Sequence, residues 1–129
     1  MEIRFENKVA FITGAAGGIG YAAARMFAEA GASVVMADLD SRVTDRAKEL
    51  EAEGHNAIGI RCDVSDEAQV KAAVEKAVAV FGKLDIAYNN VGIHAAVRED
   101  LAETEGWDFD RVISVNLRGV WNCMKYELV

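Results

Sequence analysis

Short apolar segments alternate with amphipathic helical segments along this chain, and that alternation restricts the possible folds more than any other feature of the sequence. Residues 8–13 (KVAFIT) are typical of a buried strand, and a glycine-rich turn follows them. Apolar side chains then recur at helical spacing, at Ile19, Ala23, Met26, Phe27 and Ala30. Gly31 follows them and is expected to end the helix. The N-terminal part therefore predicts a strand, a turn and a helix, in that order.

A second unit of the same kind follows directly. Residues 33–38 (SVVMAD) form a continuous apolar run, which suits a strand that is buried on both faces. One face of the helix after it is marked by Val43, Ala47 and Leu50, and the helix is expected to end before Gly54.

A third unit begins with a strand at residues 56–64 (NAIGIRCDV). The helix after it is predicted to start with Ser65 as its N-cap and to end at Gly82. Its apolar positions are Val70, Val74, Ala77, Val78 and Phe81. Residues 83–92 (KLDIAYNNVG) predict a fourth strand with its loop, and a last helix is expected from about Glu105 to the chain end.

Strands that alternate with helices are typical of right-handed crossovers in a parallel sheet covered on both faces. The sequence therefore predicts the α/β class, as a Rossmann-like doubly wound sheet of about four strands in the order 3-2-1-4 with flanking helices. No linker or low-complexity tract divides residues 1–129, so one domain is expected. The apolar fourth strand would lack a neighbour on one side, so we expect an incomplete sheet.

Composition excludes several classes of partner. Acidic residues outnumber basic ones by 21 to 14, which gives a net charge of −7 and argues against nucleic acid or anionic membranes as partners. No apolar run approaches the roughly 20 residues of a membrane span. The two cysteines are not in metal-ligand spacing and no secretory signal precedes the first strand, so we expect free thiols, no metal site and a cytoplasmic location.

The glycine-rich turn is the first candidate for a ligand site. Gly14, Gly17, Gly18 and Gly20 lie between the first strand and a helix that is expected to start near Gly18. Glycines there let a ligand approach the backbone, and the unpaired amides and positive dipole end of the helix favour a phosphate. Close packing of the helix on the strand also favours small residues, so the turn alone leaves both interpretations open.

An acidic residue strengthens the nucleotide interpretation. Asp38 ends the second strand, 18 residues after Gly20, where a carboxylate accepts hydrogen bonds from ribose hydroxyls and repels a 2′-phosphate. This position favours NAD over NADP. Arg42 lies close by in the sequence and leaves NADP open, and either Asp38 or Asp40 could serve as an ordinary turn residue.

These residues resemble the motifs of the short-chain dehydrogenase/reductase family. Residues 13–20 (TGAAGGIG) match its TGxxxGxG pattern, Asp63 and Val64 match the pair that lines the adenine pocket, and residues 89–92 (NNVG) match its NNAG motif with Val91 in place of alanine. The resemblance extends over the whole chain. The cofactor-binding residues it implies are Thr13, Gly14, Gly18, Ile19, Gly20, Asp38, Asp63, Val64, Asn89, Asn90 and Gly92.

The resemblance also reaches one catalytic position. Asn116, in SVNLRG, matches the asparagine that in this family helps to hold the active-site lysine and a proton-relay water. A buried asparagine with a purely structural role in the helix is the alternative.

The family's Tyr-x-x-x-Lys pair and its serine have no counterpart in these residues. Four positions after Tyr21 stands Arg25, Tyr88 is followed there by Gly92, and Tyr126 has no residue at that position. The neighbours Lys125 and Tyr126 should point about 100° apart on a helix. The last helix also offers no C-cap signal, so the chain is expected to stop within the helix after the fourth strand.

The resemblance implies the cofactor-binding half of an NAD-dependent oxidoreductase that acts on a hydroxyl or carbonyl substrate, inactive as this chain alone. We expect a homo-oligomer, or a partner that supplies the other half, because the open sheet edge and the apolar last helix need cover. The alternative is a non-catalytic module that binds nucleotide or only self-associates.

Overall fold

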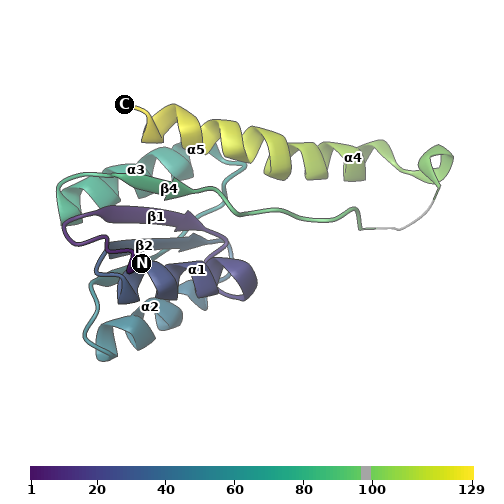
Figure 1. The fold of residues 1–129 in the computed structure, drawn as a ribbon. Coiled ribbons are helices and arrows are strands. Elements are labelled where there is room, and N and C mark those ends of the chain that lie inside the picture. The colour runs from purple at the N-terminus through teal and green to yellow at the C-terminus, as the bar shows by residue number, and fades with distance from the viewer. Residues whose placement is uncertain (97–99) are drawn as a thin grey trace.

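A parallel four-stranded sheet forms the centre of the computed structural model, which describes residues 1–96 and 100–129 (Figure 1). The strands lie in the order β3-β2-β1-β4, which confirms the predicted fold class and strand order. Their bounds are Val9–Thr13 for β1, Ser33–Asp38 for β2, Ala57–Arg61 for β3 and Ile86–Tyr88 for β4.

Helices cover both faces of this sheet. α1 (Gly18–Glu29) and α2 (Val43–Ala52) cover one face, and α3 (Glu67–Phe81) and α5 (Gly119–Glu127) cover the other. α4 (Gly106–Ile113) lies beyond the sheet (Figure 1). A short 3-10 helix at Leu101–Glu103 precedes α4. None of the helices in the described part of the chain has the length and apolar content needed to cross a membrane.

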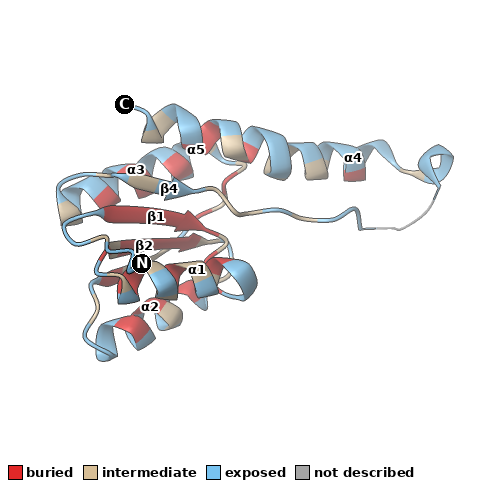
Figure 2. Cartoon of the chain, viewed as in Figure 1, coloured by how far each residue is buried: buried red, intermediate tan, exposed pale blue. Residues whose placement is uncertain are grey.

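Successive side chains of β1 enter two separate cores because strand residues alternate between faces. Ala10 and Ile12 pack with α1 and α2, whereas Val9 and Phe11 pack with α3 and with Cys123 of α5. Figure 2 shows β1 and β2 as almost wholly buried. This double burial explains why their sequences are continuous apolar runs.

The buried face of α1 differs from the predicted one. Ile19 and Met26 are 71% and 69% exposed, and the buried residues of the helix are Gly20, Ala24 and Ala28. At Gly20 the start of α1 lies so close to Gly14 that no side chain fits, so size matters more than hydropathy at that position.

The caps of α3 follow the prediction at one end only. Gly82 ends the helix in a left-handed conformation with φ of 84°, as expected. The N-cap is Asp66 and not Ser65: the Asp66 carboxylate accepts hydrogen bonds from the amides of Ala68 and Gln69 at 3.0 and 3.3 Å. The Ser65 hydroxyl donates instead to Asp63, at 2.6 Å.

The last helix is interrupted where the sequence predicted a regular one. A π-helical segment, Ser114–Arg118, joins α4 to α5. The buried residues of α5 are Gly119, Asn122 and Cys123. Large apolar side chains of this helical stretch lie on the surface: Leu117, Trp121, Met124 and Leu128 are all at least 47% exposed.

The fourth strand forms the open edge of the sheet that was predicted. β4 pairs with β1 through Ala10–Ile86, Phe11–Ala87 and Ile12–Tyr88, and no further strand of the described residues pairs with its other side. Its side chains are half-buried or exposed, in contrast to those of β1.

Candidate functional site

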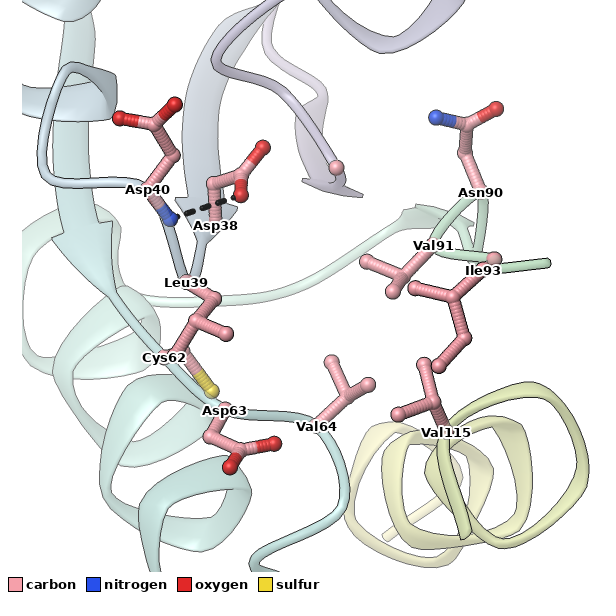
Figure 3. A pocket seen from close by; sticks show the side chains of 12 residues that line it. Asp38, Leu39, Asp40, Cys62, Asp63, Val64, Asn90, Val91, Ile93 and Val115 are labelled. Carbon is pink, nitrogen blue, oxygen red and sulfur yellow. Dashed lines mark hydrogen bonds between the residues drawn. The ribbon is translucent and has the colours of Figure 1, made fainter. Parts of the chain in front are cut away.

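A cavity of about 570 Å³ opens at the carboxyl ends of the strands. This is the place where doubly wound sheets bind ligands, next to the point where the strand order reverses between β1 and β4. Figure 3 shows side chains from both halves of the sheet around it. Its wall consists of Gly14, Asp38, Leu39, Asp40, Cys62, Asp63, Val64, Asn90, Val91, Gly92, Ile93 and Val115.

The glycine turn brings the start of α1 against the end of β1. Gly14 has a φ of 68°, and a Cβ atom on Gly20 would overlap the carbonyl group of Gly14 and lie 2.9 Å from Nδ2 of Asn90. Gly17 is the N-cap of α1 and provides no side-chain hydrogen bond to the first amides of the helix. The turn therefore leaves a positive helix end without an acidic cap.

Thr13 joins this turn to the NNVG segment. Its side-chain oxygen accepts hydrogen bonds from the amides of Asn90 and Val91 at 3.0 and 3.3 Å. Thr13 is only 2% exposed, so these bonds are shielded from water. The loop after β4 is thereby fixed to the end of β1.

The Asp38 carboxylate lies on the opposite side of the cavity from Asn90 (Figure 3). One oxygen accepts from the amide of Ala16 and the other from the amide of Asp40, both at 2.9 Å. Each carboxylate oxygen can accept a further bond. Asp38 thus orders the glycine turn and keeps acceptor capacity toward the cavity.

Arg42, which left NADP open at the sequence level, is engaged by Asp40. Its Nη2 atom lies 2.7 Å from Oδ2 of Asp40, and its backbone amide donates to Oδ1 at 2.9 Å. The side-chain hydrogen bond from Arg42 lowers the pKa of Asp40. Asp38 and Asp40 each accept from the backbone amide two positions further on, so both carboxylates take part in the turn before α2.

About half of the predicted cofactor residues form the cavity wall: Gly14, Asp38, Asp63, Val64, Asn90 and Gly92. Thr13, Gly18, Ile19, Gly20 and Asn89 lie outside it. Thr13 supports the wall by hydrogen bonds to the NNVG segment, and Gly20 by its close approach to Gly14. The Ile19 side chain is exposed. The predicted cofactor residues did not include the wall residues Leu39, Asp40, Cys62, Val91, Ile93 and Val115, although each is next to or within two positions of a predicted site residue.

The cysteine in the wall is not a reactive thiol. Burial raises the pKa of Cys62 to about 11 and that of Cys123 to about 12, so both stay protonated near neutral pH. In the described part of the chain no group of three or more His, Cys, Asp or Glu side chains is placed to hold a metal ion.

Asn116 lies in the π-helical segment and holds the backbone of Ile93. Its Oδ1 atom accepts from the Ile93 amide at 2.8 Å, and its Nδ2 atom donates to the Ile93 carbonyl at 2.9 Å. The alternative of a buried structural asparagine is wrong in its burial, because Asn116 is exposed. Both ends of its amide are nevertheless used.

Lys125 and Tyr126 do not point apart as predicted. Nζ of Lys125 and the hydroxyl of Tyr126 both reach Oε1 of Glu67, at 2.5 and 2.7 Å. The helical angle between neighbours ignored the length of the two side chains and their shared acceptor on α3. The hydrogen bond to Glu67 raises the pKa of Tyr126, which is the wrong direction for a tyrosine that exchanges protons near neutral pH.

Asn89 pairs with the half-buried carboxyl group of Glu127 at the end of α5. Its Nδ2 atom donates to Oε2 of Glu127 at 3.2 Å, while Oδ1 of Asn89 and Oε1 of Glu127 are buried and have no hydrogen-bond partner among the described residues. Burial raises the pKa of Glu127. Two buried acceptors without donors indicate a site that lacks one proton.

Replacing Glu127 with glutamine is expected to raise the free energy of unfolding at pH 7 by about 1 kcal/mol, because the new amide donates to Asn89 without carrying a charge. A carboxyl group whose pKa rises on folding supports the folded state below its ordinary pKa, and loses that support as the pH increases. The gain should therefore disappear as the pH falls below the ordinary value of 4.5.

Urea unfolding from pH 4 to pH 8 measures this dependence. The exposed Glu51 on α2 provides a matched control, and Glu51→Gln should leave stability unchanged within about 0.5 kcal/mol. A Glu127→Gln protein that is less stable than the parent at pH 7 would contradict the assignment.

A single protein-family model matches most of the chain. Residues 14–128 match the family model described as Enoyl-(Acyl carrier protein) reductase. Secoisolariciresinol dehydrogenase of Forsythia intermedia is 44% identical over 124 residues, which are 95% of this chain and 44% of that protein. Cis-4-hydroxycyclohexanecarboxylate dehydrogenase of Sinomonas cyclohexanicum is also 44% identical, over 96% of this chain and 49% of its own length.

Solved structures of dehydrogenases also match nearly the whole chain. A short chain dehydrogenase/reductase from Burkholderia phymatum in complex with NAD superposes with a TM-score of 0.90 at 38% identity, over 96% of this chain and 44% of that one. A gluconate 5-dehydrogenase from Burkholderia cenocepacia in complex with NADP and tartrate has a TM-score of 0.89 at 36% identity, over 98% and 49%. The chain spans about half the length of the relatives that it matches.

Proposed function

Because the chain belongs to the short-chain dehydrogenase/reductase family, we propose that it provides the cofactor-binding half of an NAD-dependent oxidoreductase acting on a hydroxyl or carbonyl substrate. The observation that carries this proposal is the cavity where the glycine turn, Asp38 and the NNVG segment meet. Relatives that are named as dehydrogenases of hydroxylated compounds support the substrate class.

The residues of the cavity suit a dinucleotide. The glycine turn and the start of α1 would hold the pyrophosphate, since the missing Cβ atoms and the helix dipole favour a close anion. Asp38 would accept the ribose hydroxyls, and Asp63 with Val64 would border the adenine. Asn90 and Gly92 would line the opposite end. A bound nicotinamide would supply the hydride chemistry, and these residues would orient it.

The same cavity favours NAD over NADP. Three carboxylates line it, from Asp38, Asp40 and Asp63, and these would repel the extra 2′-phosphate. Arg42, the nearby cation, is held by Asp40. Solved relatives bind either nucleotide, so the preference of this chain depends on its own side chains.

Calorimetric titration of the 129-residue chain tests the preference. We expect NAD to bind more tightly than NADP, and Asp38→Ala to weaken NAD at least tenfold, because hydrogen bonds to a charged acceptor contribute about 1.5–3 kcal/mol. Asp38→Asn, which keeps one acceptor for the Ala16 amide, separates ribose binding from order in the turn. The exposed Asp45 on α2 provides the control, since Asp45→Ala should bind NAD like the parent. Tighter binding of NADP to the parent would overturn the proposal.

Turnover needs a proton donor or acceptor beside the nicotinamide. The 129 residues contain no Tyr-x-x-x-Lys pair, and Asn116 is the one position of this chain that matches a catalytic residue of the family. We therefore propose that this chain alone binds the cofactor without oxidising alcohols. Hydride transfer by a preparation free of longer enzyme would refute this.

A self-associating module is the second candidate, and the exposed apolar surface supports it. The open edge of β4 borders a groove of about 540 Å³, lined in part by Phe5, Met26 and Phe27. The last helix also carries exposed Trp121 and Met124. In this proposal a second copy covers these surfaces, and a monomer in light scattering at high concentration would exclude it.

A further inference from the structure

Residues 93–96 run antiparallel to the last helix and are bonded to it at three places. These are hydrogen bonds: Asn116 accepts from the amide of Ile93, Arg111 donates to the carbonyl of His94, and Asp108 accepts from the amide of Ala96. The residue numbers on the helix therefore decrease as those of the segment increase, which is what an antiparallel arrangement requires. Figure 1 shows the chain after β4 passing along the helix in this way.

The π-helical segment brings the three side chains to one face. On a regular helix Asn116, eight positions after Asp108, would lie about 80° round the axis from it. A π-turn accommodates one extra residue, which reduces the angle to about 20°. Arg111, three positions after Asp108, lies about 60° away. The interruption at Ser114–Arg118 thus aligns Asn116 with the other two.

Asp108 is the buried member of this set. It is 2% exposed, and its Oδ2 atom accepts from the Ala96 amide at 2.7 Å. Its Oδ1 atom accepts from Nε and Nη2 of Arg111 at 3.2 and 2.9 Å. The same Nη2 atom donates to the His94 carbonyl at 2.7 Å. A buried carboxylate requires such partners, so the pair holds the segment in one conformation.

This conformation determines part of the cavity. Both backbone groups of Ile93 are used by Asn116, and the Ile93 side chain points into the cavity beside Val115 (Figure 3). A shift of residues 94–96 would move this wall. We propose that Asp108 and Arg111 are positioning residues, which hold residues 93–96 on the helix and so keep the Ile93 wall of the nucleotide cavity in place.

The nucleotide part of this inference rests on the proposed function, and two readouts keep them separate. Amide hydrogen exchange, followed by NMR, reports on the segment itself, and calorimetric titration with NAD reports on the cavity. For Asp108→Ala we expect the Ala96 amide to exchange at least tenfold faster and the Kd for NAD to rise about three- to tenfold. Asp110→Ala and Arg118→Met, exposed positions on the same helix, should change neither.

Two milder variants cover the case in which Asp108→Ala does not fold. Asp108→Asn keeps the shape and an acceptor but loses the charge that holds Arg111. Arg111→Lys keeps a cation but cannot reach Asp108 and His94 with one forked group. Both should raise the Kd for NAD about threefold while the unfolding midpoint stays close to that of the parent, a separation that a general loss of structure would not produce.

The outcomes are distinct. Unchanged Ala96 exchange in folded Asp108 variants would overturn the positioning role, whatever the affinity for NAD. Faster exchange with an unchanged Kd would overturn the link to the cavity. A parent chain that fails to bind NAD would refute the proposed function, while the exchange data would still decide whether Asp108 and Arg111 hold the segment.

Discussion

Replacing Gly20 with alanine should abolish measurable NAD binding and lower the free energy of unfolding by about 3 kcal/mol, at the upper end of the usual range for overpacking. The added Cβ atom would overlap the backbone of Gly14 and crowd Nδ2 of Asn90. The Gly14 carbonyl group is backbone, which cannot move away as cheaply as the end of a flexible side chain. The start of α1 must therefore shift outward from the end of β1, which displaces the amides expected to meet the pyrophosphate.

Urea unfolding and calorimetric titration measure the two effects. Gly17 in the same turn provides the control, because it is exposed and a Cβ atom there meets nothing within 4 Å. Gly17→Ala changes the N-cap of α1 and should lower stability by no more than about 1 kcal/mol, clearly less than Gly20→Ala. If Gly20→Ala were as stable as Gly17→Ala, the close approach of helix and turn would not exist in solution.

The second large effect is expected for Thr13→Val, which should lower the free energy of unfolding by about 2–4 kcal/mol. Valine keeps the shape of threonine but removes the oxygen that accepts from the amides of Asn90 and Val91. Each shielded amide left without an acceptor costs about 1–3 kcal/mol. The NNVG segment would also lose its link to β1, so NAD affinity should fall with stability.

Thr13→Ser separates this hydrogen-bond effect from packing. Serine keeps the oxygen and loses one methyl group, which corresponds to a loss of about 1 kcal/mol. Valine should therefore be clearly less stable than serine in the same unfolding experiment. The reverse order would mean that packing of the methyl group, and not the two amide bonds, explains the role of Thr13.

The features that could be predicted depend on the order of apolar segments and turns along the sequence. The continuous apolar runs identified β1 and β2 because strands covered on both faces need no alternation. The glycine turn and Asp38 were placed at the ends of those strands, and the structure brings both to the cavity. Parallel strands end at one edge of the sheet, so sequence order alone was enough.

The features that could not be predicted depend on distances between elements. At Gly20 the close approach of α1 to Gly14 leaves no room for a side chain, so size matters more than hydropathy at that position. Ser65 and Asp66 are both capable N-caps, and only the backbone decides between them. No sequence pattern announces the π-helical segment that aligns Asn116 with Asp108.

The order in which the sheet forms follows from the short fourth strand. β4 has three residues and pairs with β1 across a separation of 76 positions, as in the Ala10–Ile86 pair, so its closure carries the largest entropic penalty in the sheet. We expect β4 to dock last and to open first. The loop it carries is the one that holds Asn90 and Gly92 at the cavity. A ligand that bridges this loop and the glycine turn would therefore stabilise the closed sheet in proportion to its own affinity, and cofactor binding would also be a folding step.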